Sequence, residues 1–198
     1  MEWLSVVLGV LGVALNQVFI WPQVWRARRD VQGVAPLTAL GGLLARAAWA
    51  AYGLVVADVA LVAGNLTVAV GFAALVVLLA RAARGHRLWL VLAAAAMVAI
   101  PVVLAAVSHW ALAVLAVGSA AVVNVPQMLR AMVDRRRLAG VSAATYWLIA
   151  AASGCWLLYG LVVRNLVISA PHMLLLPTAV VTAVLARLGR SKGAGGHR

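Results

Sequence analysis

Acidic residues are scarce in this chain of 198 residues, which contains only four Asp and Glu. They are Glu2, Asp30, Asp58 and Asp134, and none lies inside a long apolar stretch. A pair of carboxylates for acid–base catalysis is therefore excluded from those stretches. Cysteine is scarcer still, because Cys155 stands alone and no intramolecular disulfide can form.

Charged residues make up only 10% of the chain, whereas 66% of the residues are hydrophobic and the mean hydropathy is +1.07. Soluble domains are about half apolar, so this composition predicts an integral membrane protein with no separate soluble domain. A spanning helix needs about 20 apolar residues, and the chain has room for roughly seven. The expected helices cover residues 3–25, 36–56, 60–80, 88–107, 110–132, 141–163 and 165–187. The fold class is accordingly all-α, with seven transmembrane helices.

The positive charge is unevenly distributed, and the formal net charge is +12. Arginines and the single lysine cluster after the first, third and fifth expected helices and in the tail, whereas Arg164 stands alone on the opposite side. Such clusters set membrane orientation, which predicts a cytoplasmic C-terminus and an external N-terminus. Nucleic-acid binding is not expected, because no polar region remains to carry it. The excess of Arg over Lys in an Ala-rich chain suggests a bacterial cytoplasmic membrane.

The chain contains an internal repeat. The segment 49–56 recurs as 156–163, with six identities in eight residues at an offset of 107. Pro22-Gln23 recurs as Pro126-Gln127, and Gly33-Val34 recurs as Gly140-Val141. Each copy is a three-helix unit, and an odd number of spans requires a linking helix to keep two copies parallel. We therefore expect repeats over 1–82 and 109–188, a linker helix over 83–108 and a disordered basic tail over 189–198.

This 3 + 1 + 3 pattern, with a Pro-Gln pair in the first helix of each repeat and Trp-x-x-Tyr-Gly in the second, resembles the PQ-loop superfamily. Within that superfamily the chain is most similar to the SWEET and SemiSWEET sugar transporters. The resemblance implies that Trp49, Asn65 and Trp156 line a substrate cavity. It also implies hinge roles for both Pro-Gln pairs in an inner gate.

Spacing alone places several polar and aromatic residues at one depth. Trp49 and Asn65 are 16 residues apart around a turn near residue 57, so in an antiparallel hairpin both lie about 12 Å below that turn. This is near the middle of a hydrocarbon core about 30 Å thick. Trp156 and His172 repeat the spacing around Arg164. Indole faces and hydrogen-bonding groups suit a sugar, although packing and interhelical hydrogen bonding are the alternative roles.

Two features depart from a simple neutral-sugar site. Arg46 lies ten residues into its helix, one turn from Trp49, and has no obvious acidic partner; it either attracts an anionic or strongly hydrogen-bonding substrate or snorkels to the membrane surface. His172 adds a protonatable group.

The candidate gating residues are Pro22, Gln23, Pro126 and Gln127, with a static kink as the alternative.

We expect a membrane carrier for a small polar solute, most simply facilitated bidirectional transport of sugar by alternating access. The alternatives are an amino-acid or organic-anion transporter of the PQ-loop type, and a non-transporting sorting-type receptor. No enzyme activity, cofactor or metal is expected, because the spans offer no ligand cluster or oriented nucleophile. The expected partners are the small polar substrate and the lipid bilayer, and a homo-oligomer remains open.

Overall fold

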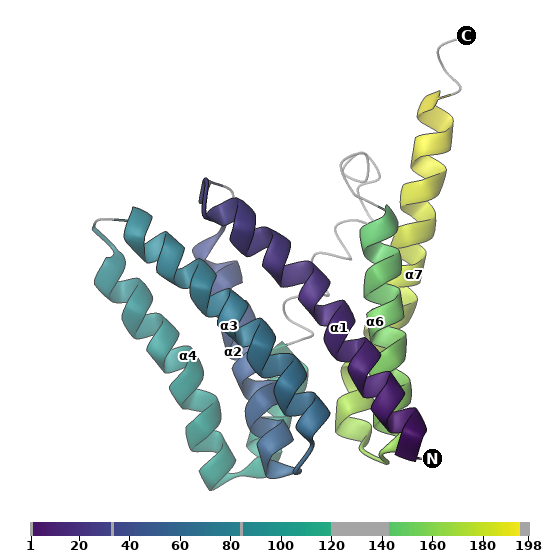
Figure 1. Cartoon of the computed structure of the whole chain (residues 1–198), viewed down its shortest axis with the longest axis horizontal. Helices are drawn as coiled ribbons and strands as arrows, with labels where there is room; N and C mark the ends of the chain where they lie inside the picture. The colour runs from purple at the N-terminus through teal and green to yellow at the C-terminus, as the bar shows by residue number, and fades with distance from the viewer. Residues whose placement is uncertain (1, 33, 84, 120–142, 195–198) are drawn as a thin grey trace. The chain divides into compact units, whose positions relative to one another are not determined.

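The computed structural model describes residues 2–32, 34–83, 85–119 and 143–194, and these residues are arranged in helices (Figure 1). Six of the helices are long and apolar enough to cross a membrane. Their bounds are α1 Glu2–Ala27, α2 Pro36–Val55, α3 Val59–Ala82, α4 Arg87–Val107, α6 Ala143–Val162 and α7 Leu166–Ala194. A shorter apolar helical segment, His109–Ser119, begins where a further span is expected. The chain is thus a multi-pass, all-α membrane protein, as its composition predicts.

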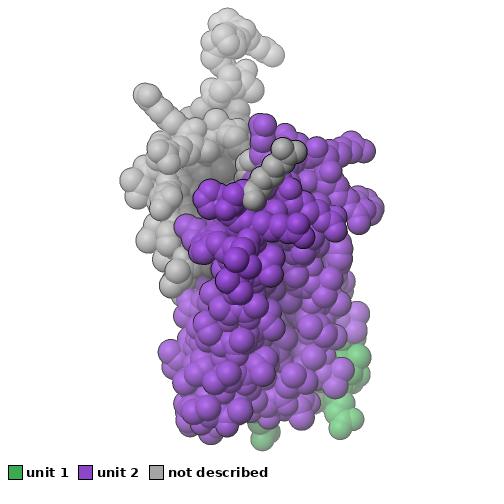
Figure 2. Space-filling view, turned by 90° about the vertical axis from the view of Figure 1, so that its left-hand side faces the viewer, with its two compact units in different colours: residues 1–8, 121–198 green, residues 9–120 purple. Residues whose placement is uncertain are grey.

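The chain divides into two compact units, which Figure 2 colours separately. Unit 1 comprises residues 1–8 and 121–198, and unit 2 comprises residues 9–120. Within the described residues, unit 2 contains most of α1 together with α2, α3 and α4, and unit 1 contains α6 and α7. The division into repeats over 1–82 and 109–188 with a linker over 83–108 stays a prediction.

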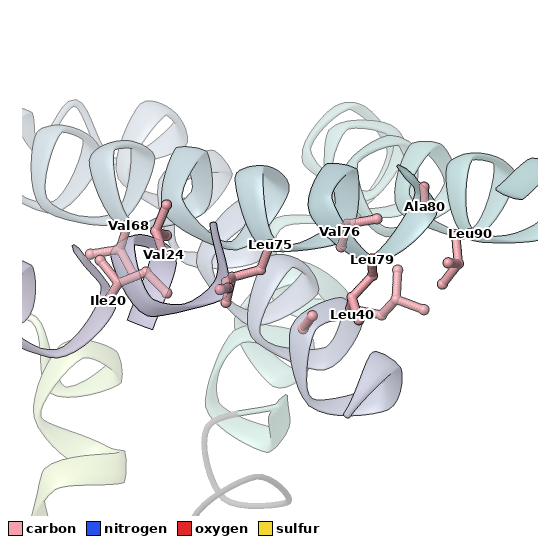
Figure 3. Packing of buried hydrophobic residues seen from close by; sticks show 11 residues of the cluster. Ile20, Val24, Leu40, Val68, Leu75, Val76, Leu79, Ala80 and Leu90 are labelled. Atoms are coloured by element: carbon pink, nitrogen blue, oxygen red, sulfur yellow. The ribbon is translucent and has the colours of Figure 1, made fainter. Parts of the chain in front are cut away.

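The core of unit 2 is formed where α3 packs against its three neighbours. Ile20 and Val24 of α1 lie beside Val68 of α3, and farther along α3 Leu79 lies near Leu40 of α2 (Figure 3). The start of α4 joins the same cluster through Leu90, which is 2% exposed. The described apolar residues outside this cluster include many exposed Val, Leu and Trp side chains, such as those of α4. In a membrane those side chains face lipid, so their exposure carries no penalty.

Small residues allow the helices of unit 2 to approach closely. A Cβ atom added at Gly71 of α3 would overlap Ile20 of α1, and one added at Gly42 of α2 would overlap the Phe72 ring of α3. In lipid, helix association depends on such close packing because burial of apolar surface gives little driving force. The two glycines therefore seat α1 and α2 against α3.

Unit 1 is built around the hairpin of α6 and α7, which pack along their length. Tyr146 of α6 meets Leu175 and Ala183 of α7 in a buried cluster. Nearer the turn, Ser169 Oγ of α7 donates a hydrogen bond of 3.0 Å to the carbonyl of Leu157 in α6. Interhelical polar bonds of this kind hold helices together in lipid.

The basic tail that we expect to be disordered over 189–198 is described by the structure only as far as Ala194. Helix α7 continues to Ala194, although its apolar part ends at Leu185. Arg, Leu, Ala and Lys are good helix formers, so a helix that is already nucleated in the membrane propagates into this basic stretch. Residues 195–198 lie outside the described residues, so a disordered tail stays a prediction.

Candidate functional site

The turn between α2 and α3 fixes the register of the first hairpin. The backbone N–H of Asp58 donates to the carbonyl of Gly53 at 2.8 Å, and the Asp58 carboxylate accepts from the N–H of Leu61 at 2.8 Å. The carboxylate thus caps the first turn of α3, whose free N–H groups favour an anionic acceptor. Ala57 takes a left-handed conformation, with φ of 55°, to complete the turn.

The turn between α6 and α7 repeats this geometry at the same offset of 107 residues. Asn165 N–H donates to the carbonyl of Gly160 at 2.8 Å, and Arg164 has φ of 56°. Asn165 replaces the capping aspartate, and its side-chain oxygen accepts from the N–H of Val167 at 3.1 Å. The duplicated sequence therefore folds into duplicated turns, and residues at equal distance from each turn occupy equivalent depths.

Each hairpin buries one tryptophan against the tyrosine one turn later. Trp49 and Tyr52 meet edge to face with ring centroids 6.0 Å apart, and Trp156 and Tyr159 do so at 5.5 Å. The two indoles are only 6% and 4% exposed. An edge-to-face contact orients a ring and contributes about 0.5–1.5 kcal/mol beyond area burial. The Trp-x-x-Tyr spacing that stands out in the sequence therefore fixes the orientation of each indole.

The buried amide of Asn65 pairs with Arg46 across the first hairpin. Arg46 Nη1 donates to Asn65 Oδ1 at 3.1 Å, and Asn65 Nδ2 donates to the Leu61 carbonyl at 2.9 Å. Asn65 is 3% exposed and Arg46 is half-buried. Sequence analysis missed this pair because it sought a carboxylate partner for Arg46. The signal was available, since Asn65 is level with Trp49 and Arg46 lies one turn from Trp49 on the same face.

The second hairpin carries different groups at the equivalent positions. Ser153 stands where α2 has Arg46, and it is 3% exposed. His172 stands where α3 has Asn65, and it is half-buried on α7. A hydroxyl and an imidazole thus replace a guanidinium and an amide. Within each unit, the structure brings the predicted polar group to the hairpin that also carries the predicted tryptophan.

A polar chain between α1 and α3 was not predicted. Gln17 Nε2 donates to Thr67 Oγ1 at 2.8 Å, and Trp21 Nε1 donates to Gln17 Oε1 at 3.0 Å. The hydroxyl of Thr67 in turn donates to the Ala63 carbonyl at 2.9 Å. No repeat of this arrangement is visible in the sequence, so neither periodicity nor duplication marked these residues.

The candidate gating residues are only partly covered by the structure. Pro22 lies inside α1, five residues before the helix ends at Ala27, and both Pro22 and Gln23 are exposed. Pro126 and Gln127 lie outside the described residues. A hinge at either pair therefore stays a prediction.

Among the described residues, no group of three or more His, Cys, Asp or Glu side chains is placed to hold a metal ion.

The comparison with solved structures identifies the architecture. The chain matches "The 3.7 A resolution structure of a eukaryotic SWEET transporter" with a TM-score of 0.85 and 18% sequence identity, over 96% of this chain and 98% of that one. The two chains share one fold. This confirms the seven-helix, SWEET-like fold that the sequence resemblance implies. No protein-family model matches the chain, and no curated protein matches its sequence.

Proposed function

We propose that this protein is a membrane carrier for a small polar solute, with sugars as the substrate class. The observation that carries the proposal is the full-length match to the fold of a SWEET transporter. The paired hairpins support it, because each combines an oriented, buried indole with a polar group at the same depth. A flat indole face packs on the C–H face of a sugar ring, while amide and imidazole groups bond its hydroxyls.

The residues we assign to substrate binding are Trp49, Asn65 and Arg46 in the first hairpin and Trp156 and His172 in the second. Burial supports this assignment, since the two indoles and the Asn65 amide are shielded from bulk solvent within long apolar helices. Asn65 uses one N–H donor on the Leu61 carbonyl and one oxygen lone pair on Arg46, so its amide retains a second donor and a second acceptor site for the hydroxyls of a solute. The alternative role is packing alone, which predicts a loss of stability rather than a selective loss of transport.

We further propose that transport is facilitated and uncoupled, through alternating access. The described apolar helices contain no Asp or Glu beyond the Glu2 at the start of α1, and carriers driven by protons commonly use buried carboxylates or histidines as relays. In the proposed site the one group of this kind is His172, and the pH dependence of uptake tests its role. Hinge motion at Pro22-Gln23 and Pro126-Gln127 is the proposed gate. The clusters of Arg favour a cytoplasmic C-terminus and an external N-terminus in the cell membrane.

Uptake into proteoliposomes tests the carrier proposal. The purified chain is reconstituted and offered labelled neutral sugars, amino acids and organic anions without any ion gradient. We expect saturable sugar-class uptake that Trp49→Phe and Asn65→Ala reduce by about tenfold, as loss of one good contact implies.

Trp25→Ala is the matched control, because Trp25 is 68% exposed on α1 and its loss leaves no cavity. Each variant is first shown to be monodisperse, so that misfolding is not mistaken for loss of the site. Absence of uptake for every solute, with intact protein in the vesicles, would refute the carrier proposal and favour a receptor.

A further inference from the structure

Arg46 is the one basic residue between Pro36 and Val55, and α2 itself contains no acidic residue. Asp58 is the only acid between residues 31 and 133. It lies at the hairpin turn, about 18 Å along the helix axis from Arg46, where its carboxylate caps α3. Arg46 instead bonds the neutral amide oxygen of Asn65. The guanidinium charge is therefore hydrogen-bonded but not neutralised within its own unit.

The alternative role for Arg46 is snorkelling, which would direct its head back toward the start of α2. Arg46 lies ten residues from Pro36, about 15 Å along the helix and thus about half the thickness of the hydrocarbon core. Its Nη1 atom donates to Asn65. Asn65 is closer to the turn than Arg46 is, because it lies eight residues from residue 57 and Arg46 lies eleven residues from residue 57. The guanidinium is thus held toward the turn, at the level of Trp49, and not toward the nearer membrane surface.

The bond to Asn65 leaves most of the guanidinium available. An arginine head carries five N–H donors in a planar fork, and the bond to Asn65 uses one of them at Nη1. That fork matches a carboxylate through two parallel hydrogen bonds, which no neutral hydroxyl can reproduce. A charged group held inside a span is costly unless an opposite charge meets it. A solute that carries a carboxylate supplies that negative charge. When the solute leaves, the arginine again carries the free-energy cost of an unneutralised charge.

We propose that Arg46 selects a sugar acid over the corresponding neutral sugar, with the guanidinium receiving the carboxylate and Trp49 packing on the ring. This inference rests on the proposed function, because it names the substrate class of the same site. Asn65 acts as a positioning residue that holds the guanidinium at the depth of the indole. The second hairpin, with Ser153 and His172 at the equivalent positions, contributes no guanidinium, so selection for the carboxylate comes from the first hairpin alone.

The test uses pairs of sugars that differ only in the carboxylate. D-glucuronate and D-glucose form one pair, and D-galacturonate and D-galactose form another. Labelled uptake into proteoliposomes is measured for the wild type, Arg46→Gln and Arg46→Lys, with Arg81→Gln as the matched control because Arg81 is exposed in the last turn of α3. Gln removes the charge and keeps a neutral amide donor on a shorter side chain, whereas Lys keeps the charge without the planar fork.

We expect the wild type to take up each acid at least about tenfold faster than its neutral partner at equal concentration. Arg46→Gln should lower uptake of the acids by about 10- to 100-fold and should lower the ratio of acid to neutral-sugar uptake by at least about tenfold. Arg46→Lys should retain an intermediate preference, because the charge remains but the fork is lost. Arg81→Gln should behave as the wild type.

The failures of the two proposals are distinguishable. Uptake of glucose and galactose that equals or exceeds that of the acids, and that Arg46→Gln leaves unchanged, would overturn the sugar-acid inference while the carrier stands. Equal loss of acid and neutral uptake in Arg46→Gln would also overturn it, since a selective role is absent. Failure to transport either member of both pairs would overturn the inference, and failure of the whole solute panel would overturn the carrier proposal as well.

Discussion

Gly160→Ala should destabilise the protein even though alanine is the better helix former. A Cβ atom at residue 160 would contact Ser169 Oγ and would lie 2.8 Å from Ser169 N and 3.0 Å from the Asn165 carbonyl oxygen. Two of these neighbours are backbone atoms at the start of α7, so they cannot move without disturbing the turn. Forcing a methyl group into such a site costs about 1–3 kcal/mol.

Two further effects adjust that cost. Displacing Ser169 threatens its 3.0 Å hydrogen bond to the Leu157 carbonyl, worth about 1 kcal/mol. Replacing glycine inside a helix returns about 1 kcal/mol. The two effects nearly cancel, so we expect a net loss of about 2 kcal/mol, set mainly by overpacking.

Gly154→Ala is the matched control on the same helix. No described atom lies within 4 Å of a Cβ built at residue 154, and the equivalent residue of the first hairpin is already Ala47. This substitution should leave stability unchanged or raise it by up to about 1 kcal/mol. The two glycines differ only in what their missing side chain would meet.

Thermal unfolding of both variants in detergent, followed by tryptophan fluorescence at one scan rate, measures the difference. At about 2–4 °C per kcal/mol for a chain of this size, Gly160→Ala should melt about 4–8 °C below the wild type. Gly154→Ala should melt at or slightly above it. If Gly160→Ala melts as high as Gly154→Ala, the close approach of α6 and α7 at Gly160 is wrong.

Four other substitutions, at three positions, test the turns and the transport mode. Ala57→Gly should raise the free energy of unfolding by about 0.5 kcal/mol, and with it the melting temperature, because glycine adopts the left-handed φ of 55° without strain. A lower melting temperature would contradict that turn. Asp58→Ala should cost about 1 kcal/mol through loss of the cap on Leu61, while Asp58→Asn should retain most of it; equal losses would argue against capping. His172→Gln and the wild type should both show uptake that is flat between about pH 5.5 and 8, because the proposed transport is uncoupled, and a pH dependence removed by the substitution would instead indicate a protonated step.

The helices could be predicted because the membrane imposes their length. Apolar runs expected over 36–56 and 88–107 became α2 at Pro36–Val55 and α4 at Arg87–Val107, within a residue at each end. Proline at the first position of α2 and the aspartate cap of α3 are signals of a helix start that can be read from the sequence. The end of α7 was less predictable, because a basic stretch leaving the membrane can continue as a helix or stop.

The candidate site was only half predictable from spacing. Counting from the turn placed Trp49 and Asn65 at one depth, because hairpin geometry is fixed by rise per residue. The partner of Arg46 depended instead on which long side chain reaches across the hairpin, a rotamer choice that depth alone does not settle. The bond from Gln17 to Thr67 depended on how closely α1 approaches α3. That approach is governed by the space left at Gly71, which no periodicity encodes.

The two hairpins share their turn geometry but carry unlike residues at equivalent positions. Backbone bonds at Asp58 and Asn165 agree in pattern and length, and both turns use a residue with φ near 55°. The fold therefore constrains the two hairpins to one geometry, yet Arg46 corresponds to Ser153 and Asn65 to His172. These two pairs of side chains are therefore the chemical difference between the hairpins within the site that we propose. Exchanging single residues between equivalent positions changes the chemistry while leaving the turns intact, which makes them the natural targets for altering substrate choice.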